Sequence, residues 1–135
     1  MTAPVDAPRC LRCRTAELQR LPESTAGMAF FACPSCGRHY ARAAGKALTF
    51  RWLHPISLAL HPVLFFPDPA GAEGKSARAL MEGKAPAQIA ALADEIDLEL
   101  AHPTQQVRDI IGNAASEEKC RAFLAGVVRE LRAPR

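Results

Sequence analysis

Two pairs of cysteines near the N-terminus constrain this chain more than any other feature of its sequence. Cys10 and Cys13 form the first pair, Cys33 and Cys36 form the second, and nineteen residues separate the two pairs. A CxxC turn places two sulfur atoms on one side of a tight loop, and two such loops brought together by a hairpin form a tetrahedral set of four sulfurs. This spacing is typical of structural zinc sites. We therefore expect the four cysteines to bind one structural Zn²⁺ ion.

The residues around the second pair support this expectation. Pro34 fixes φ early in the turn, and Gly37 can adopt the left-handed conformation that the chain needs as it leaves the site. Iron in a rubredoxin-like site is the main alternative, because the CPxCG sequence of the second pair suits either metal. The pattern is weaker at the first pair, where Arg14 stands in place of the glycine.

Two other uses of the cysteines are disfavoured. A disulfide framework would leave a fifth cysteine, Cys120, unpaired, and the first residues show neither the basic nor the apolar region of a signal peptide. A thioredoxin-type motif would lie at a strand-to-helix junction of a βαβ unit, and the sequence indicates none. We expect a cytoplasmic protein in which Cys120 is a small apolar residue of a helix core.

Charge is distributed unevenly along the chain. Residues 1–52 carry eight Arg or Lys and three acids, a net charge of +5, whereas residues 68–135 have a net charge of −2. Four thiolates with one Zn²⁺ contribute a charge of −2, which lowers the N-terminal total to about +3. This basic bias is smaller than that of dedicated nucleic-acid-binding proteins. Our candidates for contact with nucleic acid or another partner are the arginines near the cysteines: Arg12, Arg14, Arg38 and Arg42.

The expected fold class is α+β. Residues 17–21, 28–32, 38–42 and 47–52 show the short patterns of strands, which predict an antiparallel zinc ribbon of three to four strands. So small a sheet cannot bury a sufficient core, so its folding should depend on the metal.

Helical periodicity follows in the C-terminal half. Residues 75–82 predict a short helix, Pro86 begins a second helix, and Pro103 begins a third. Ser116 caps the last helix, whose apolar residues recur at helical spacing as far as Leu131. We therefore expect a small helical unit of three to four helices.

These patterns divide the chain into three parts. Residues 1–52 are the expected zinc ribbon, residues 53–74 an apolar, proline-rich connecting segment and linker, and residues 75–135 the helical unit. The apolar stretch at 52–66 is too short and too interrupted by prolines to span a bilayer, so we expect no membrane partner. This stretch either packs the ribbon against the helices or presents a docking surface, and the small cores of both halves favour packing.

Several polar residues have an ordinary structural explanation. His54 and His61 each precede a proline without further metal ligands nearby, and we expect structural or surface roles for both. The acids from Asp94 to Glu99 are expected to form the solvated face of a helix.

Residues 10–42, with the motifs CLRC and CPSCGRHY, resemble a zinc ribbon of the transcription-factor-IIB type. Residues 10–66 are also similar to small uncharacterised bacterial proteins in which such a ribbon precedes an RWL-P-ISL-like segment, here Arg51 to Leu58. The resemblance implies a ribbon fold and its metal. Zinc ribbons occur in transcription factors, polymerase subunits, ribosomal proteins and adaptors, so it also implies a binding role without naming the partner.

The sequence shows no catalytic constellation beside the cysteines. It lacks a Gly-rich phosphate loop, an HExxH motif and a Ser/His/Asp arrangement, and four thiolates leave no open position on zinc for water. We expect a non-catalytic zinc module that mediates protein interaction in a regulatory or transcription-related setting. One alternative is nucleic-acid binding through the basic ribbon, with Phe30, Phe31 and Tyr40 stacking on bases. The other is iron-based, rubredoxin-like electron transfer.

Overall fold

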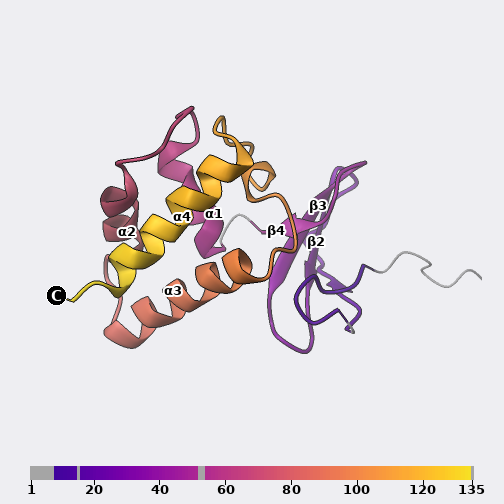
Figure 1. Ribbon diagram of the computed structural model, residues 1–135. Helices are drawn as coiled ribbons and strands as arrows, with labels where there is room; N and C mark the ends of the chain where they lie inside the picture. Colours follow the sequence, from indigo (N-terminus) through magenta and orange to yellow (C-terminus); the bar gives the residue numbers. More distant parts are fainter. Residues whose placement is uncertain (1–7, 15, 52–53, 135) are drawn as a thin grey trace, which may run out of the picture. The chain divides into compact units, whose positions relative to one another are not determined.

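The computed structural model describes residues 8–14, 16–51 and 54–134. It divides the chain after Arg51 into two compact units, which are described separately here (Figure 1). The first unit holds an antiparallel sheet and the second holds helices. The expected α+β class is therefore confirmed.

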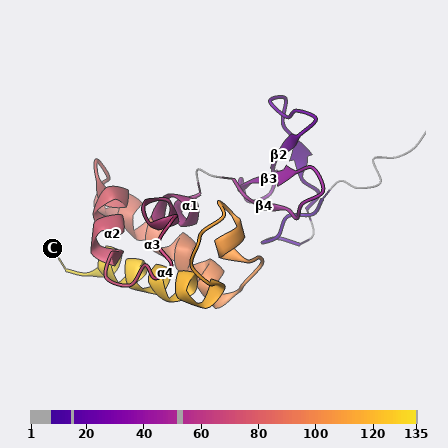
Figure 2. The same cartoon turned by 90° about the horizontal axis from the view of Figure 1, so that it is seen from above.

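The N-terminal unit, the ribbon, is a four-stranded antiparallel sheet with its strands in sequence order (Figures 1 and 2). The strands are β1 (Gln19–Arg20), β2 (Met28–Ala32), β3 (His39–Ala43) and β4 (Thr49–Phe50). The register pairs Phe31 with Tyr40 and Tyr40 with Phe50, so the three rings share one face. The rings of Tyr40 and Phe50 stack with their centroids 5.5 Å apart.

That face is the whole apolar core of the sheet. Tyr40, Phe50 and Phe31 are at most 3% exposed, and Leu18 and Ala29 complete the cluster. A core of this size is small for an independent domain, so we expect the ribbon to depend on a metal cross-link at its cysteines.

The second unit, the helical unit, contains four α-helices and two short 3₁₀ helices in the described part of the chain. They are α1 (Pro55–Leu60), η1 (His61–Val63), α2 (Glu73–Met81), α3 (Pro86–Ala101), η2 (Val107–Asp109) and α4 (Glu117–Arg132). Helix α4 packs along α2 and α3 (Figures 1 and 2). Its expected apolar face is buried throughout, from Cys120 to Leu131, and Ser116 caps it by accepting from the Lys119 amide at 3.2 Å. None of the described helices is both long enough and apolar enough to cross a bilayer.

The segment expected as a connection contains helix α1. His54 caps this helix, since its Nδ1 accepts from the Ile56 amide at 3.1 Å, and Pro55 supplies the fixed φ of the first helical position. Ile56 and Leu60 are fully buried, and α1 contacts α2, α3 and α4. The segment therefore contributes to the core of the helical unit itself. Residues 52 and 53 lie outside the described part.

The helix expected from Pro103 is wrong, because only the 3₁₀ turn η2 forms there. Carboxylates from the neighbouring helices accept hydrogen bonds from the backbone of this stretch and so compete with helix formation. Glu99 accepts from the Thr104 amide at 2.8 Å, and Glu117 accepts from the amides of Val107 and Arg108 at 3.0 and 2.9 Å.

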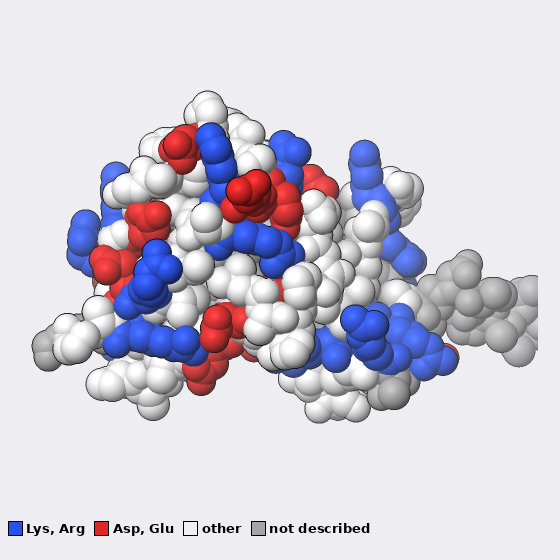
Figure 3. Space-filling view, viewed as in Figure 1, with Lys and Arg blue, Asp and Glu red and all other residues white. Residues whose placement is uncertain are grey.

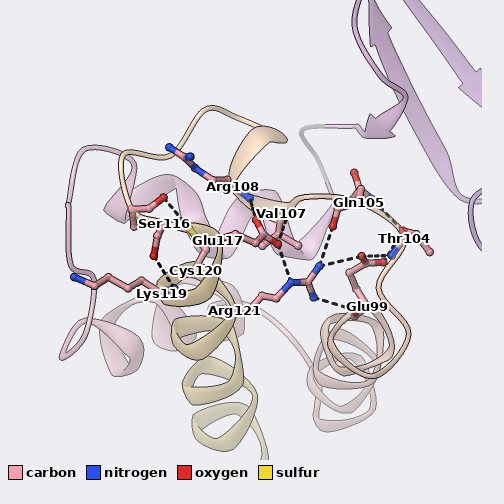
Figure 4. Close-up of polar contacts among 11 residues, drawn as sticks. Glu99, Thr104, Gln105, Val107, Arg108, Ser116, Glu117, Lys119, Cys120 and Arg121 are labelled. Atoms are coloured by element: carbon pink, nitrogen blue, oxygen red, sulfur yellow. Dashed lines mark hydrogen bonds and ion pairs between the residues drawn. The ribbon is translucent and has the colours of Figure 1, made fainter.

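The expected solvated position of Glu99 is also wrong. Its side chain is fully buried and accepts from the hydroxyl of Thr104 at 2.8 Å (Figure 4). Arg121 lies between the two carboxylates, with its Nε 2.7 Å from Glu117 and its Nη2 3.8 Å from Glu99. It also donates to the Gln105 carbonyl at 2.8 Å. One arginine thus joins α3, α4 and the loop between them.

Arg121→Ala should destabilise the helical unit by about 3 kcal/mol, because Glu99 would keep a buried charge without its cation. The matched control is Arg132→Ala. Arg132 pairs with Asp94 and Asp97 at the surface, where ion pairs contribute little. Urea denaturation followed by far-UV circular dichroism measures both variants. Similar losses in the two variants would contradict the role assigned to Arg121.

Candidate metal centre

Two loops of matching conformation carry the four cysteines. In the first, the Arg14 amide donates to the Cys10 carbonyl at 2.9 Å, and in the second, the Gly37 amide donates to the Cys33 carbonyl at 2.9 Å. Both closing residues are left-handed, with φ values of 65° for Arg14 and 77° for Gly37. The arginine that weakens the sequence motif therefore adopts the conformation for which glycine is preferred.

Each loop also points amide hydrogens at its first sulfur. The Cys13 amide lies 3.4 Å from the Cys10 sulfur, and the Cys36 amide lies 3.4 Å from the Cys33 sulfur. Such hydrogen bonds favour the thiolate over the thiol. The thiolate is the form of cysteine that binds metal. Strand β2 leads directly into the second loop and β3 leaves it, so the central hairpin fixes the position of this pair.

The four sulfur atoms form one compact group. They lie within 4.8 Å of one another, with 3.7 Å between Cys10 and Cys36 and 3.9 Å between Cys13 and Cys33. A regular tetrahedron of sulfurs around an ion at roughly 2.3 Å has edges of about 3.8 Å. The donor set and its dimensions fit a tetrahedral thiolate site, and the cysteines can hold a metal ion.

Ionisation of the cysteines shows why a cation belongs at this position. Burial raises the pKa of Cys10, but hydrogen bonds from the Cys13 amide and the Tyr40 hydroxyl contribute to a net lowering to about 6. In contrast, the hydrogen bond with Cys36 is the main cause that raises the pKa of Cys13 to about 12. The pKa of Cys13 therefore lies well above that of Cys10, and a nearby positive charge would favour loss of the Cys13 proton. A divalent metal ion supplies such a charge.

Tyr40 supports the centre from the sheet. Its hydroxyl lies 3.2 Å from the Cys10 sulfur, and its side chain is fully buried. Burial, followed by the hydrogen bond with Cys10, raises the pKa of Tyr40 above its usual range, so the hydroxyl keeps its proton and donates it toward sulfur. In the alternative of nucleic-acid binding, Tyr40 was a candidate for stacking on bases. The register of the central hairpin is the signal that identifies the neighbours of Tyr40. It pairs Tyr40 with Phe31, which precedes Cys33 by two residues.

The structure separates the four candidate arginines. Arg12 and Arg14 belong to the first cysteine loop, and Arg38 directly follows the second. Arg42 pairs with Ala29, toward the other end of the hairpin. Its guanidinium lies over the ring of Phe31, 5.4 Å from the centroid.

The alternative in which bases stack on the ribbon aromatics is wrong for two of the three residues. Phe31 is 3% exposed and Tyr40 is fully buried, so neither ring can receive a base. Phe30 is half-buried, and the guanidinium of Arg51 lies 4.0 Å from its ring centroid.

Comparison of the chain with models of protein families, with curated proteins and with solved structures finds no match. What this site does must therefore be argued from its own chemistry.

Cys33→Ser should abolish tight metal binding and unfold the ribbon, because binding and folding are coupled in a sheet with so small a core. Cys120→Ala is the matched control, since this thiol is fully buried in α4 and its pKa is raised, chiefly by burial. Elemental analysis of both purified variants measures and identifies the metal, and limited proteolysis reports on the ribbon. Full metal content in Cys33→Ser would contradict the assignment.

Tyr40→Phe should keep the ribbon folded but lower its affinity for added Zn²⁺ by roughly 10- to 100-fold, as is typical when a hydrogen bond to a ligand is removed. The phenylalanine ring retains the stack on Phe50, so the change isolates the hydroxyl. Competition with a chromogenic chelator measures the affinity. An unchanged affinity would show that the hydroxyl serves packing alone.

Proposed function

We propose that this chain is a zinc-stabilised binding module that acts without catalysis, in a regulatory or transcription-related setting in the cytoplasm. The observation that carries the proposal is the closed set of four cysteine sulfurs. With four protein ligands, a tetrahedral ion has no position for water or substrate, and its role is structural. The ribbon is, on this proposal, of the transcription-factor-IIB type.

Zinc is the proposed metal because thiolates are soft ligands and the tetrahedral S₄ arrangement suits it. Iron fits the same four sulfurs and would make the chain an electron carrier. The hydrogen bond between Tyr40 and Cys10 and the small core of the sheet both favour a folding role for the ion, which zinc performs without redox chemistry.

A protein is the first candidate partner. The helical unit exposes Phe65 and Phe66, at 83% and 46%, and Leu58 at 41%. Exposed aromatics are common where proteins contact each other. A binding role of this kind requires only that the metal hold the ribbon in one shape.

Nucleic acid is the second candidate, and the basic side chains of the cysteine loops favour it. Arg12, Arg14 and Arg38 come from both loops, whereas the described ribbon holds only two acids, Glu17 and Glu23. With its aromatics covered, contact would run through phosphates and would be independent of sequence.

Affinity capture from the native organism tests the proposal and separates the candidates. The metal-loaded chain should retain a partner that Cys33→Ser loses and Cys120→Ala keeps, because only the former disrupts the ribbon. A partner that survives nuclease treatment is a protein, and one that disappears is held through nucleic acid. Binding should then be reproduced with the purified partner. Retention of that partner by Cys33→Ser, or turnover of a substrate that depends on a residue other than the cysteines, would contradict the binding-module function.

A further inference from the structure

The ribbon has a basic hollow toward the end of its central hairpin that is farther from the cysteines. The register pairs Arg20 with Phe31 and Arg42 with Ala29, which places both arginines on the same face of the sheet. There they border a hollow of about 530 Å³, and its other lining residues include Lys46 and the small residues Thr25, Ala29 and Gly45. Only Arg42 among these was a candidate from the sequence.

Local structure sets the positions of the three cationic side chains, Arg20, Arg42 and Lys46. The Arg42 guanidinium rests over the Phe31 ring, 5.4 Å from its centroid, which restricts its motion. Lys46 follows a turn in which its amide donates to the Ala43 carbonyl at 2.9 Å, and Gly45 has the φ of 74° that this turn requires. Arg20 is exposed at β1.

No acid lines the hollow, so the three positive charges are uncompensated there. Of the two acids in the described ribbon, Glu23 lies 2.9 Å from Arg51, and this hydrogen bond lowers the pKa of Glu23. Figure 3 shows Lys and Arg side chains gathered over the ribbon, with little acidic surface among them on that face. The local potential therefore attracts an anion.

We infer that this hollow binds the phosphate backbone of a nucleic acid strand. A guanidinium matches phosphate oxygens in a bidentate manner, and an ammonium adds a third donor group. The small residues of the lining let a strand approach the backbone of the sheet. Because the lining contains no aromatic residue, the contact is independent of base sequence.

A nucleic acid suits the ribbon better than an acidic protein segment. Residues 1–52 carry a net charge of +5 before metal binding, and Arg12, Arg14 and Arg38 add further positive charge at the cysteine loops, toward the other end of the hairpin. A continuous polyanion satisfies such an extended set, since it presents a charge at every nucleotide. The inference deepens the second candidate of the proposed function and rests on the metal-bound ribbon for its fold.

The test uses the full, metal-loaded chain and fluorescein-labelled oligodeoxythymidylate, as a single strand and annealed to oligodeoxyadenylate. Fluorescence anisotropy should give an affinity that Arg20→Ala/Lys46→Ala weakens at least about tenfold. Neither of these exposed side chains has a described contact in the ribbon. The control, Lys75→Ala/Lys84→Ala, removes the same charge from exposed positions of the helical unit and should change little.

Salt dependence provides a second readout. Three phosphate contacts predict a slope of log affinity against log salt of about −2 for the single strand and nearer −3 for the duplex. In the ribbon double variant the magnitude of this slope should decrease, to a value of about −1. Inorganic phosphate should compete only weakly, because it offers one group in place of a strand.

Three results would overturn the inference. The first is an equal loss of oligonucleotide affinity in the two double variants, and the second is no binding at low salt. The third is an oligoglutamate peptide that binds as tightly as the oligonucleotide. The last result would assign the hollow to an acidic protein. Metal content measured on the same samples separates this failure from failure of the proposed function, because a chain that holds its zinc but ignores the oligonucleotide remains a candidate protein-binding module.

Discussion

Four cysteine sulfurs of the ribbon lie close enough together to hold one cation, beside a sheet that has little core of its own. Hydrogen bonds from the Cys13 amide and the Tyr40 hydroxyl outweigh burial and lower the pKa of Cys10, whereas the hydrogen bond with Cys36 is the main cause of the raised pKa of Cys13. The sheet adds little stability of its own, since its core consists of little more than the stacked rings of Tyr40 and Phe50 with Phe31 beside them. The hydroxyl of Tyr40 connects the two contributions, because one side chain both fills the core and donates to a ligand sulfur.

The helical unit obtains its stability by other means. Its last helix buries an uninterrupted apolar face, and a fully buried carboxylate, Glu99, is satisfied by Thr104 and Arg121. Buried ion pairs seldom add stability over an apolar core, but they are costly to break. Here the pair fixes the path of an irregular loop, because Arg121 also donates to the Gln105 carbonyl.

The sequence could predict those parts of the fold that follow from short-range patterns. The CxxC spacing indicated which sulfurs would meet, and the period of α4 indicated its buried face, because both depend on residues close along the chain. The loop after Pro103 depends instead on carboxylates from two different helices that accept from its amides. No periodicity reveals such contacts. Helix α1 was missed for a different reason, because its cap is the imidazole of His54, which is not among the usual capping residues.

Binding surfaces of the ribbon were the least predictable part, because they follow from strand register. Alternation along one strand shows which residues share a face, but only pairing across strands brings Arg20 and Arg42 to the same hollow. The register also explains why the aromatics are covered. Phe31 and Tyr40 face each other on the apolar side, next to the cysteine loop, and a ring that supports the metal cannot also stack on a base. In a sheet this small, the aromatic core and the cysteine loops occupy one end of this face, and the cations toward its other end remain available for recognition.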